Sequence, residues 1–87
     1  MPKFIKKNRL KLEDPATYEI CVQGYLEEVW ADRLANMVIT KHFKDDQAPV
    51  TTLVGEVNDQ SELIGVINGL YELRMPILSL ELKNEEV

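Results

Sequence analysis

The sequence is poor in residues that build disulfides, metal sites or catalytic dyads, because it holds one cysteine, Cys21, and one histidine, His42. A single cysteine cannot form a disulfide within the chain, which excludes a disulfide-stapled secreted fold. The longest apolar runs, residues 63–67 and 76–80, fall far short of the ~18–20 residues of a membrane-spanning helix. No apolar stretch follows the N-terminal lysines, unlike in a signal peptide. We therefore expect a protein of a reducing cytoplasm with no membrane span.

The chain is also too short for two domains, since 87 residues divided in two would leave pieces unable to bury a core. We expect one α+β domain over residues 15–83, preceded by a basic arm, residues 1–14, and followed by a frayed acidic tail, residues 84–87. The arm carries five basic and two acidic residues, and the whole chain has a net charge of −5. An acidic body repels phosphate backbones, so we expect no nucleic-acid partner.

Apolar periodicity predicts the elements of this domain. Alternation of apolar and polar residues predicts a strand over residues 18–26, with Gly24 as a kink near its end, and another over residues 77–82, with Leu78, Leu80 and Leu82 on one face. Valine, threonine and other β-branched residues predict strands over residues 38–43 and 50–57. Apolar residues that recur three and four positions apart predict a helix over residues 27–37. Asn36, in a left-handed conformation, is expected to end it. A second helix is predicted from its N-cap Asp59, with Glu62 three residues on, to the residues before Pro76.

The order β-α-β-β-α-β predicts a ferredoxin-like two-layer sandwich, a four-stranded antiparallel sheet with both helices on one face. We expect five apolar helix residues to be buried against the sheet: Trp30, Leu34, Leu63, Ile67 and Leu70. Gly65 and Gly69 weaken the second helix, which predicts close packing by a neighbouring element or by another subunit.

The chain resembles a group of small uncharacterised bacterial proteins. The shared residues form three stretches: Tyr18-Glu19-Ile20-x-Val22-x-Gly24-x-Leu26 with Trp30, then Thr51-Thr52-Leu53-Val54-Gly55-x-Val57-x-Asp59-Gln60-x-x-Leu63, then Leu70 with Pro76-Ile77-Leu78-Ser79. The similarity spans about residues 18–80. It implies the fold and no activity, because that group has none assigned.

The sequence lacks the residues that three functions of this fold require: acylphosphatase activity, metal transfer by paired cysteines and RNA binding. Val22-Gln23-Gly24-Tyr25 resembles the start of the acylphosphatase signature, but carboxylates follow where an arginine should hold phosphate. Ferredoxin-like metal chaperones need two cysteines, and RNA-recognition motifs need aromatic and basic residues that the strand at 50–57 lacks.

Two hypotheses built on the single cysteine and histidine stay open at this point. Cys21 and His42 with Asp45 or Asp46 could form a metal site, and Cys21 beside His42 on neighbouring strands could form a catalytic dyad. The metal site would draw its three ligands from separate elements, and the dyad has no third member and no oxyanion-hole motif recognisable in the sequence. We therefore assign no catalytic residue, no metal ligand and no cofactor.

The sheet face opposite the helices is the expected interaction surface. Its predicted members come from all four strands: Glu19, Cys21, Gln23, Tyr25, Thr40, His42, Thr52, Val54, Glu56, Ser79 and Glu81. Six of these form the possible interaction face: Cys21, Gln23, Tyr25, His42, Thr52 and Val54. The leading hypothesis is a non-enzymatic interaction or regulatory module that forms a homodimer. The alternatives are a small-molecule-binding domain of the ACT-like kind, by analogy of fold, and an enzyme using Cys21 and His42.

Overall fold

The computed structural model describes residues 10–43 and 48–83. Most of the predicted arm, residues 44–47 and the predicted tail, residues 84–87, lie outside the described residues. Asp45 and Asp46, considered above as metal ligands, are therefore not described.

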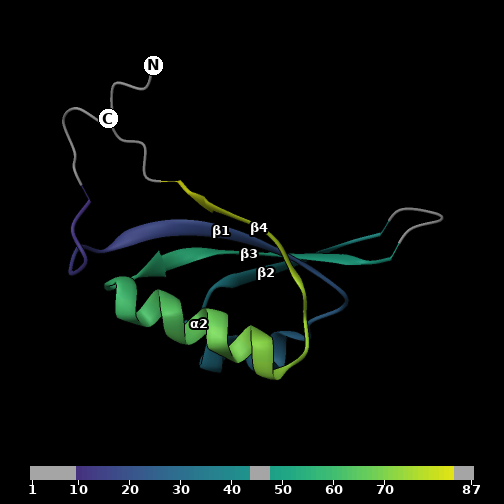
Figure 1. Ribbon diagram of the computed structural model, residues 1–87. Helices are drawn as coiled ribbons and strands as arrows, with labels where there is room; N and C mark the ends of the chain where they lie inside the picture. Colours follow the sequence, from purple (N-terminus) through teal and green to yellow (C-terminus); the bar gives the residue numbers. More distant parts are fainter. Residues whose placement is uncertain (1–9, 44–47, 84–87) are drawn as a thin grey trace, which may run out of the picture.

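A four-stranded antiparallel sheet forms one layer of the protein (Figure 1). Its strands are β1 (Ala16–Gln23), β2 (Val38–His42), β3 (Val50–Val57) and β4 (Ile77–Leu82). They lie in the order β2-β3-β1-β4, so β1 and β3 are central and β2 and β4 are the two edges. The predicted α+β class with an antiparallel sheet is confirmed.

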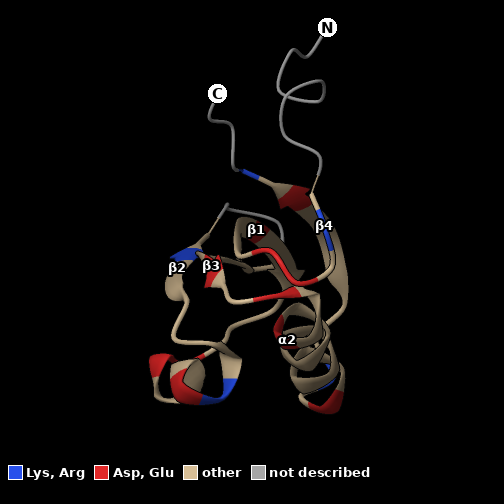
Figure 2. Cartoon of the chain, turned by 90° about the vertical axis from the view of Figure 1, so that its left-hand side faces the viewer, with Lys and Arg blue, Asp and Glu red and all other residues tan. Residues whose placement is uncertain are grey.

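Two helices, η1 (Glu28–Leu34) and α2 (Gln60–Glu72), lie on the same side of this sheet (Figure 2). α2 lies towards β4, and η1 lies towards β2. The core between them and the sheet comes from alternate strand residues and one stripe of each helix, with its fully buried side chains at Ile20, Val22, Leu26, Leu34, Thr51, Leu53, Val57, Val66 and Leu70. In the part of the chain that the structure describes, no helix has the length and apolar character needed to cross a membrane.

The buried helix residues agree largely with the pattern read from the sequence. Leu34, Leu63 and Leu70 are buried as predicted. Trp30 and Ile67 are only partly buried, although both pack against the core.

The first helix differs from the prediction in both type and length. It is a seven-residue 3₁₀-helix rather than an α-helix through residue 37, and its N-cap residue, Glu27, makes no side-chain cap hydrogen bond. Asn36 adopts a left-handed conformation as predicted, with φ 54°, and Ala35 before it does so too, with φ 59°. Two consecutive left-handed residues end the helix and turn the chain into β2.

Both ends of α2 are satisfied by specific hydrogen bonds. Asp59 accepts the backbone N–H of Glu62 at 2.9 Å, which confirms the predicted N-cap. The carboxylate of Glu62 accepts the N–H of Asn58 at 2.7 Å, so the helix start is capped twice. At the other end Arg74 is left-handed, with φ 62°, and the N–H of Met75 donates to the carbonyl of Leu70 at 3.1 Å. This Schellman-type end stops the helix before Pro76.

The last residues of the predicted arm contact the domain. The carbonyl of Leu12 accepts the N–H of Gln60, the first residue of α2, at 2.9 Å. A turn closed by two hydrogen bonds holds this carbonyl in place: the N–H of Asp14 donates to the carbonyl of Lys11, and the N–H of Lys11 donates to the carboxylate of Asp14. Residues 10–14 therefore contribute an acceptor to the N-terminus of α2, although the sequence suggests an independent arm.

Of the two glycines in α2, only one is explained by packing within the chain. A Cβ at Gly69 would lie 3.0 Å from Cδ2 of Leu34, whereas a Cβ at Gly65 would meet nothing within 4 Å. Close approach of η1 therefore accounts for Gly69 and leaves Gly65 exposed on the helix surface.

This difference predicts opposite responses of the two glycines to alanine. Gly65→Ala should raise the free energy of unfolding by about 1 kcal/mol, because alanine has the better helix propensity and meets no obstacle. Gly69→Ala should gain much less or lose stability, since the new methyl group must displace the buried side chain of Leu34. Urea denaturation of both variants checks this. Equal stabilisation by the two changes would show that η1 does not pack tightly on α2.

Candidate interaction surfaces

The sheet face opposite the helices is built from residues that alternate with the core positions. The strand register places Cys21 opposite Thr52, which in turn lies opposite Thr40, and sets Gln23 and His42 on either side of Val50. The alternation read from the sequence is therefore correct for these strand residues. Cys21 is half-buried, and its Sγ lies 3.7 Å from Oγ1 of Thr52.

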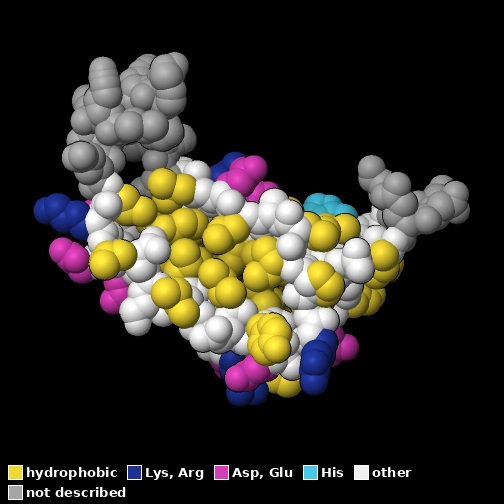
Figure 3. All heavy atoms as spheres, viewed as in Figure 1, with side chains coloured by type: hydrophobic (Ala, Val, Ile, Leu, Met, Phe, Trp, Pro, Cys, Tyr) yellow, Lys and Arg dark blue, Asp and Glu magenta, His cyan; other side chains and the backbone are white. Residues whose placement is uncertain are grey.

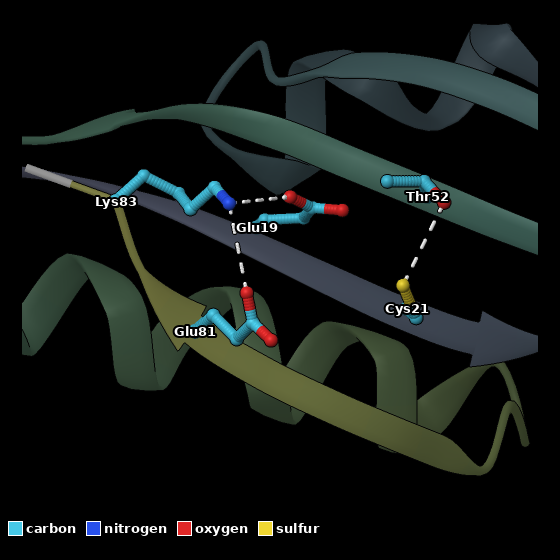
Figure 4. A network of polar contacts seen from close by, with 5 residues as sticks. All are labelled: Glu19, Cys21, Thr52, Glu81 and Lys83. Carbon is cyan, nitrogen blue, oxygen red and sulfur yellow. Dashed lines mark hydrogen bonds and ion pairs between the residues drawn. The ribbon is translucent and has the colours of Figure 1, made fainter.

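At the β4 end of this face, Lys83 pairs with two carboxylates (Figure 4). Nζ of Lys83 lies 3.3 Å from Oε1 of Glu19 and 3.6 Å from Oε1 of Glu81. The hydrogen bond and charge of Glu19, followed by the charge of Glu81, raise the pKa of Lys83 above its ordinary value. The face is thus polar and already satisfied within the chain at its β4 end.

Tyr25 does not belong to this face, contrary to the prediction. β1 ends at Gln23, and Gly24, with φ 110°, turns the chain out of the strand. The Tyr25 ring then packs against Phe43, with ring centroids 5.0 Å apart, and beneath Nζ of Lys41 at 5.3 Å. Tyr25 therefore lies in an aromatic and cationic cluster at the end of β2.

The proposed pairing of Cys21 with His42 requires the two residues to lie on neighbouring strands. They do not. Cys21 is on β1 and His42 is on β2, with β3 between them. Two strand spacings amount to about 10 Å, so the imidazole has no direct contact with the thiol. Within residues 10–43 and 48–83 no group of three potential metal ligands comes together either.

A second surface, which the sequence analysis missed, combines edge strand β4 with the outer side of α2. Leu80 and Leu82 lie opposite Ile20 and Tyr18 of β1, so they are on the core side of the sheet. They are nevertheless 42% and 45% exposed, because α2 does not extend over them. Ile77 and Leu78, beside the irregularity in this pairing, are exposed as well.

α2 extends this apolar strand edge. Ile64, Ile67 and Tyr71 recur at helical spacing on the side of α2 away from Gly69, and Gly69 faces η1. Tyr71 is the most exposed of the three, at 74%. Figure 3 shows hydrophobic side chains gathered in the middle of this side of the molecule. We call this surface the β4–α2 face and define it by seven residues: Ile64, Ile67, Tyr71, Ile77, Leu78, Leu80 and Leu82.

Two shallow cavities lie near Trp30. One, of about 210 Å³, lies between η1 and α2 beside Gly65 and Gly69, where the guanidinium of Arg33 covers the Trp30 ring at 5.5 Å. The other, of about 270 Å³, lies at the turn after β1 and is lined partly by Arg74. Both volumes are below the ~300–1,000 Å³ of ordinary small-molecule sites.

Residues 17–81 match the model of a protein family described as a domain of unknown function (DUF8691). The chain belongs to this family. The predicted relation to a small uncharacterised family is confirmed, while its bacterial distribution stays a prediction. No curated protein and no solved structure matches the chain. The DUF8691 match runs from β1 into β4 and includes every residue of the β4–α2 face except Leu82, so both surfaces described above belong to the family domain.

Proposed function

We propose that the protein is a non-enzymatic interaction or regulatory module of the cytoplasm that self-associates through its β4–α2 face. The proposal includes a ferredoxin-like fold. That assignment is supported by the β-α-β-β-α-β order, by antiparallel central strands β1 and β3, and by helices on one side of the sheet. A single half-buried cysteine agrees with a reducing compartment.

The observation that carries this proposal is the exposure of contiguous large apolar side chains on one side of a small domain. Six members of the β4–α2 face are 39–74% exposed: Ile64, Tyr71, Ile77, Leu78, Leu80 and Leu82. Monomeric soluble proteins seldom expose large contiguous apolar patches, and such patches mark interaction sites. A domain of 87 residues also has a small core, and burial of further apolar surface between subunits stabilises it.

The open sheet face is a weaker candidate for the same role. Its residues are largely polar, and Lys83 already pairs with Glu19 and Glu81 there. Its exposed apolar residues are Val38 and Val54, which lie opposite each other and are 67% and 36% exposed. An interface here would bury these two valines but would also desolvate the ion pairs, and that desolvation costs free energy.

Light scattering coupled to gel filtration at low micromolar concentration tests the proposal. We expect the wild type at twice its chain mass of 10.0 kDa. Leu80→Lys should give monomers, because it places an ammonium group in the apolar face. Val54→Lys is the matched control on the open face and should leave the dimer intact. A monomeric wild type would contradict the proposed self-association. A dimer that survives Leu80→Lys and dissociates with Val54→Lys would assign the interface to the open sheet face.

A small-molecule-binding role of the ACT-like kind is the second candidate. The observation that favours it is the lining of the cavity at the turn after β1, where Tyr25, Trp30 and Arg74 offer two aromatic rings and one cation; its volume of about 270 Å³ suits only a ligand smaller than usual. A thermal-shift screen against metabolites separates it from the first, since a ligand that binds only the folded state raises the melting temperature.

A further inference from the structure

We infer that the partner is a second copy of this chain and that the two copies join edge to edge, β4 pairing antiparallel with β4 across a two-fold axis at Leu80. The two sheets then form one continuous eight-stranded sheet. This inference rests on the proposed self-association and specifies how it is built.

The backbone of β4 presents hydrogen-bonding groups outward at the required positions. The N–H of Lys83 donates to the carbonyl of Thr17 on β1 at 2.8 Å. Antiparallel pairing alternates inward and outward groups, so the N–H and C=O groups of Leu80 and Leu82 point away from β1. β4 is the terminal strand of the described sheet, and its outer edge is open to a further strand.

The sequence of β4 selects one symmetric register. Antiparallel pairing about Leu80 sets Leu80 opposite its own copy, Ser79 opposite Glu81 and Leu78 opposite Leu82, so five of the six residues of β4 face one another. A shift to an axis at Glu81 would oppose two carboxylates at the closest strand spacing, which is destabilising. A shift to an axis at Ser79 would set Leu82 opposite Pro76, which lies outside β4 and has no N–H to donate. The register about Leu80 alone pairs the leucines with leucines and avoids like charges.

Such a joint also buries the apolar side chains that α2 leaves uncovered. A two-fold axis perpendicular to the sheet keeps both α2 helices on the same side. Leu80 and Leu82 of each copy then meet below the strands, and Ile64 and Tyr71 flank them from the two helices. Backbone pairing and apolar burial therefore use the same surface.

Charge favours this edge over the rest of the molecule. The chain carries a net charge of −5, which opposes association of two copies. Residues 77–83 contain one acidic and one basic side chain, Glu81 and Lys83, 3.6 Å apart. The strand is thus neutral where the copies would touch. The opposite edge, β2, is shorter and holds Lys41, whose ammonium group lies over Tyr25.

Disulfide trapping tests the register. All variants carry Cys21→Ser, because Cys21 lies opposite Ser79 on β1 and would otherwise compete for a new thiol. Opposed residues of antiparallel strands have Cα atoms about 4.5–5.5 Å apart, within the range that a disulfide spans. Leu80→Cys should therefore oxidise to a covalent dimer on a non-reducing gel.

Two single variants provide the control on the exposed side of the strand. Ser79→Cys and Glu81→Cys should remain unlinked alone and should cross-link when the two proteins are mixed. A dimer in light scattering without any of these cross-links would overturn edge pairing and leave the proposed self-association standing. Cross-linking of Glu81→Cys by itself would overturn the register, and a monomeric wild type would overturn both proposals.

Discussion

Leu70→Ala is expected to lower the free energy of unfolding by about 2–5 kcal/mol, a large part of what a domain of this size possesses. Leu70 has no exposed surface and lies in the core between α2 and the sheet. Alanine preserves helix propensity, so the loss measures burial and the cavity left behind. Urea denaturation of the wild type and the variant gives the difference.

Leu12→Ala is the matched control for this experiment. It removes the same atoms from a side chain that is 74% exposed and keeps the backbone carbonyl that accepts the N–H of Gln60. We expect a change within about 0.5 kcal/mol. Equal effects at the two positions would contradict the packing of α2 described above.

Thr51→Val should cost about 2–4 kcal/mol, although it removes a single hydroxyl group. Thr51 is fully buried on the core side of β3. Its Oγ1 donates to the carbonyl of Gly24 at 2.7 Å and accepts the N–H of Leu26 at 3.2 Å. Valine leaves both backbone groups without this partner, and each buried unpaired group costs about 1–3 kcal/mol. The same hydroxyl thus holds both sides of the turn at Tyr25.

Thr52→Val is the control for the change of chemistry. Thr52 lies next in the strand, on the open face, and its hydroxyl contacts only the sulfur of Cys21 among the described polar partners. We expect a loss below about 1 kcal/mol in thermal or urea unfolding. If Thr51→Val is as mild as this control, the turn after β1 does not depend on the threonine hydroxyl.

The strands and α2 could be predicted from the sequence because their signals are local. Alternation from Tyr18 to Gln23 reflects one buried and one solvated sheet face, and these residues do lie in β1, although the strand begins at Ala16 and ends three residues before the predicted end at Leu26. The cap at Asp59 and the stop before Pro76 likewise depend on residues within one turn of the helix ends. Such features need no knowledge of the rest of the fold.

The missed features depend on how the elements sit in space. The alternation of Leu78, Leu80 and Leu82 with Ser79 and Glu81 places the leucines on the helix side of the sheet, and only the position of α2 shows that they are exposed. Nor does sequence show that β3 separates Cys21 from His42. Trp30 and Leu34 have helical spacing that fits an α-helix, whereas the seven residues of η1 form a 3₁₀-helix closed by two left-handed residues.

The strand order also has a consequence for how the protein acquires its structure during synthesis. β1 is made first, yet its partners are β3 and β4, and Tyr18 must wait for Leu82 to be made before that pairing can close. Proteins dominated by such distant pairings fold more slowly than those built from local contacts. A nascent chain therefore carries β1 with an unpaired edge until β4 has emerged from the ribosome, and during that interval it is open to chaperones or to pairing with the wrong strand.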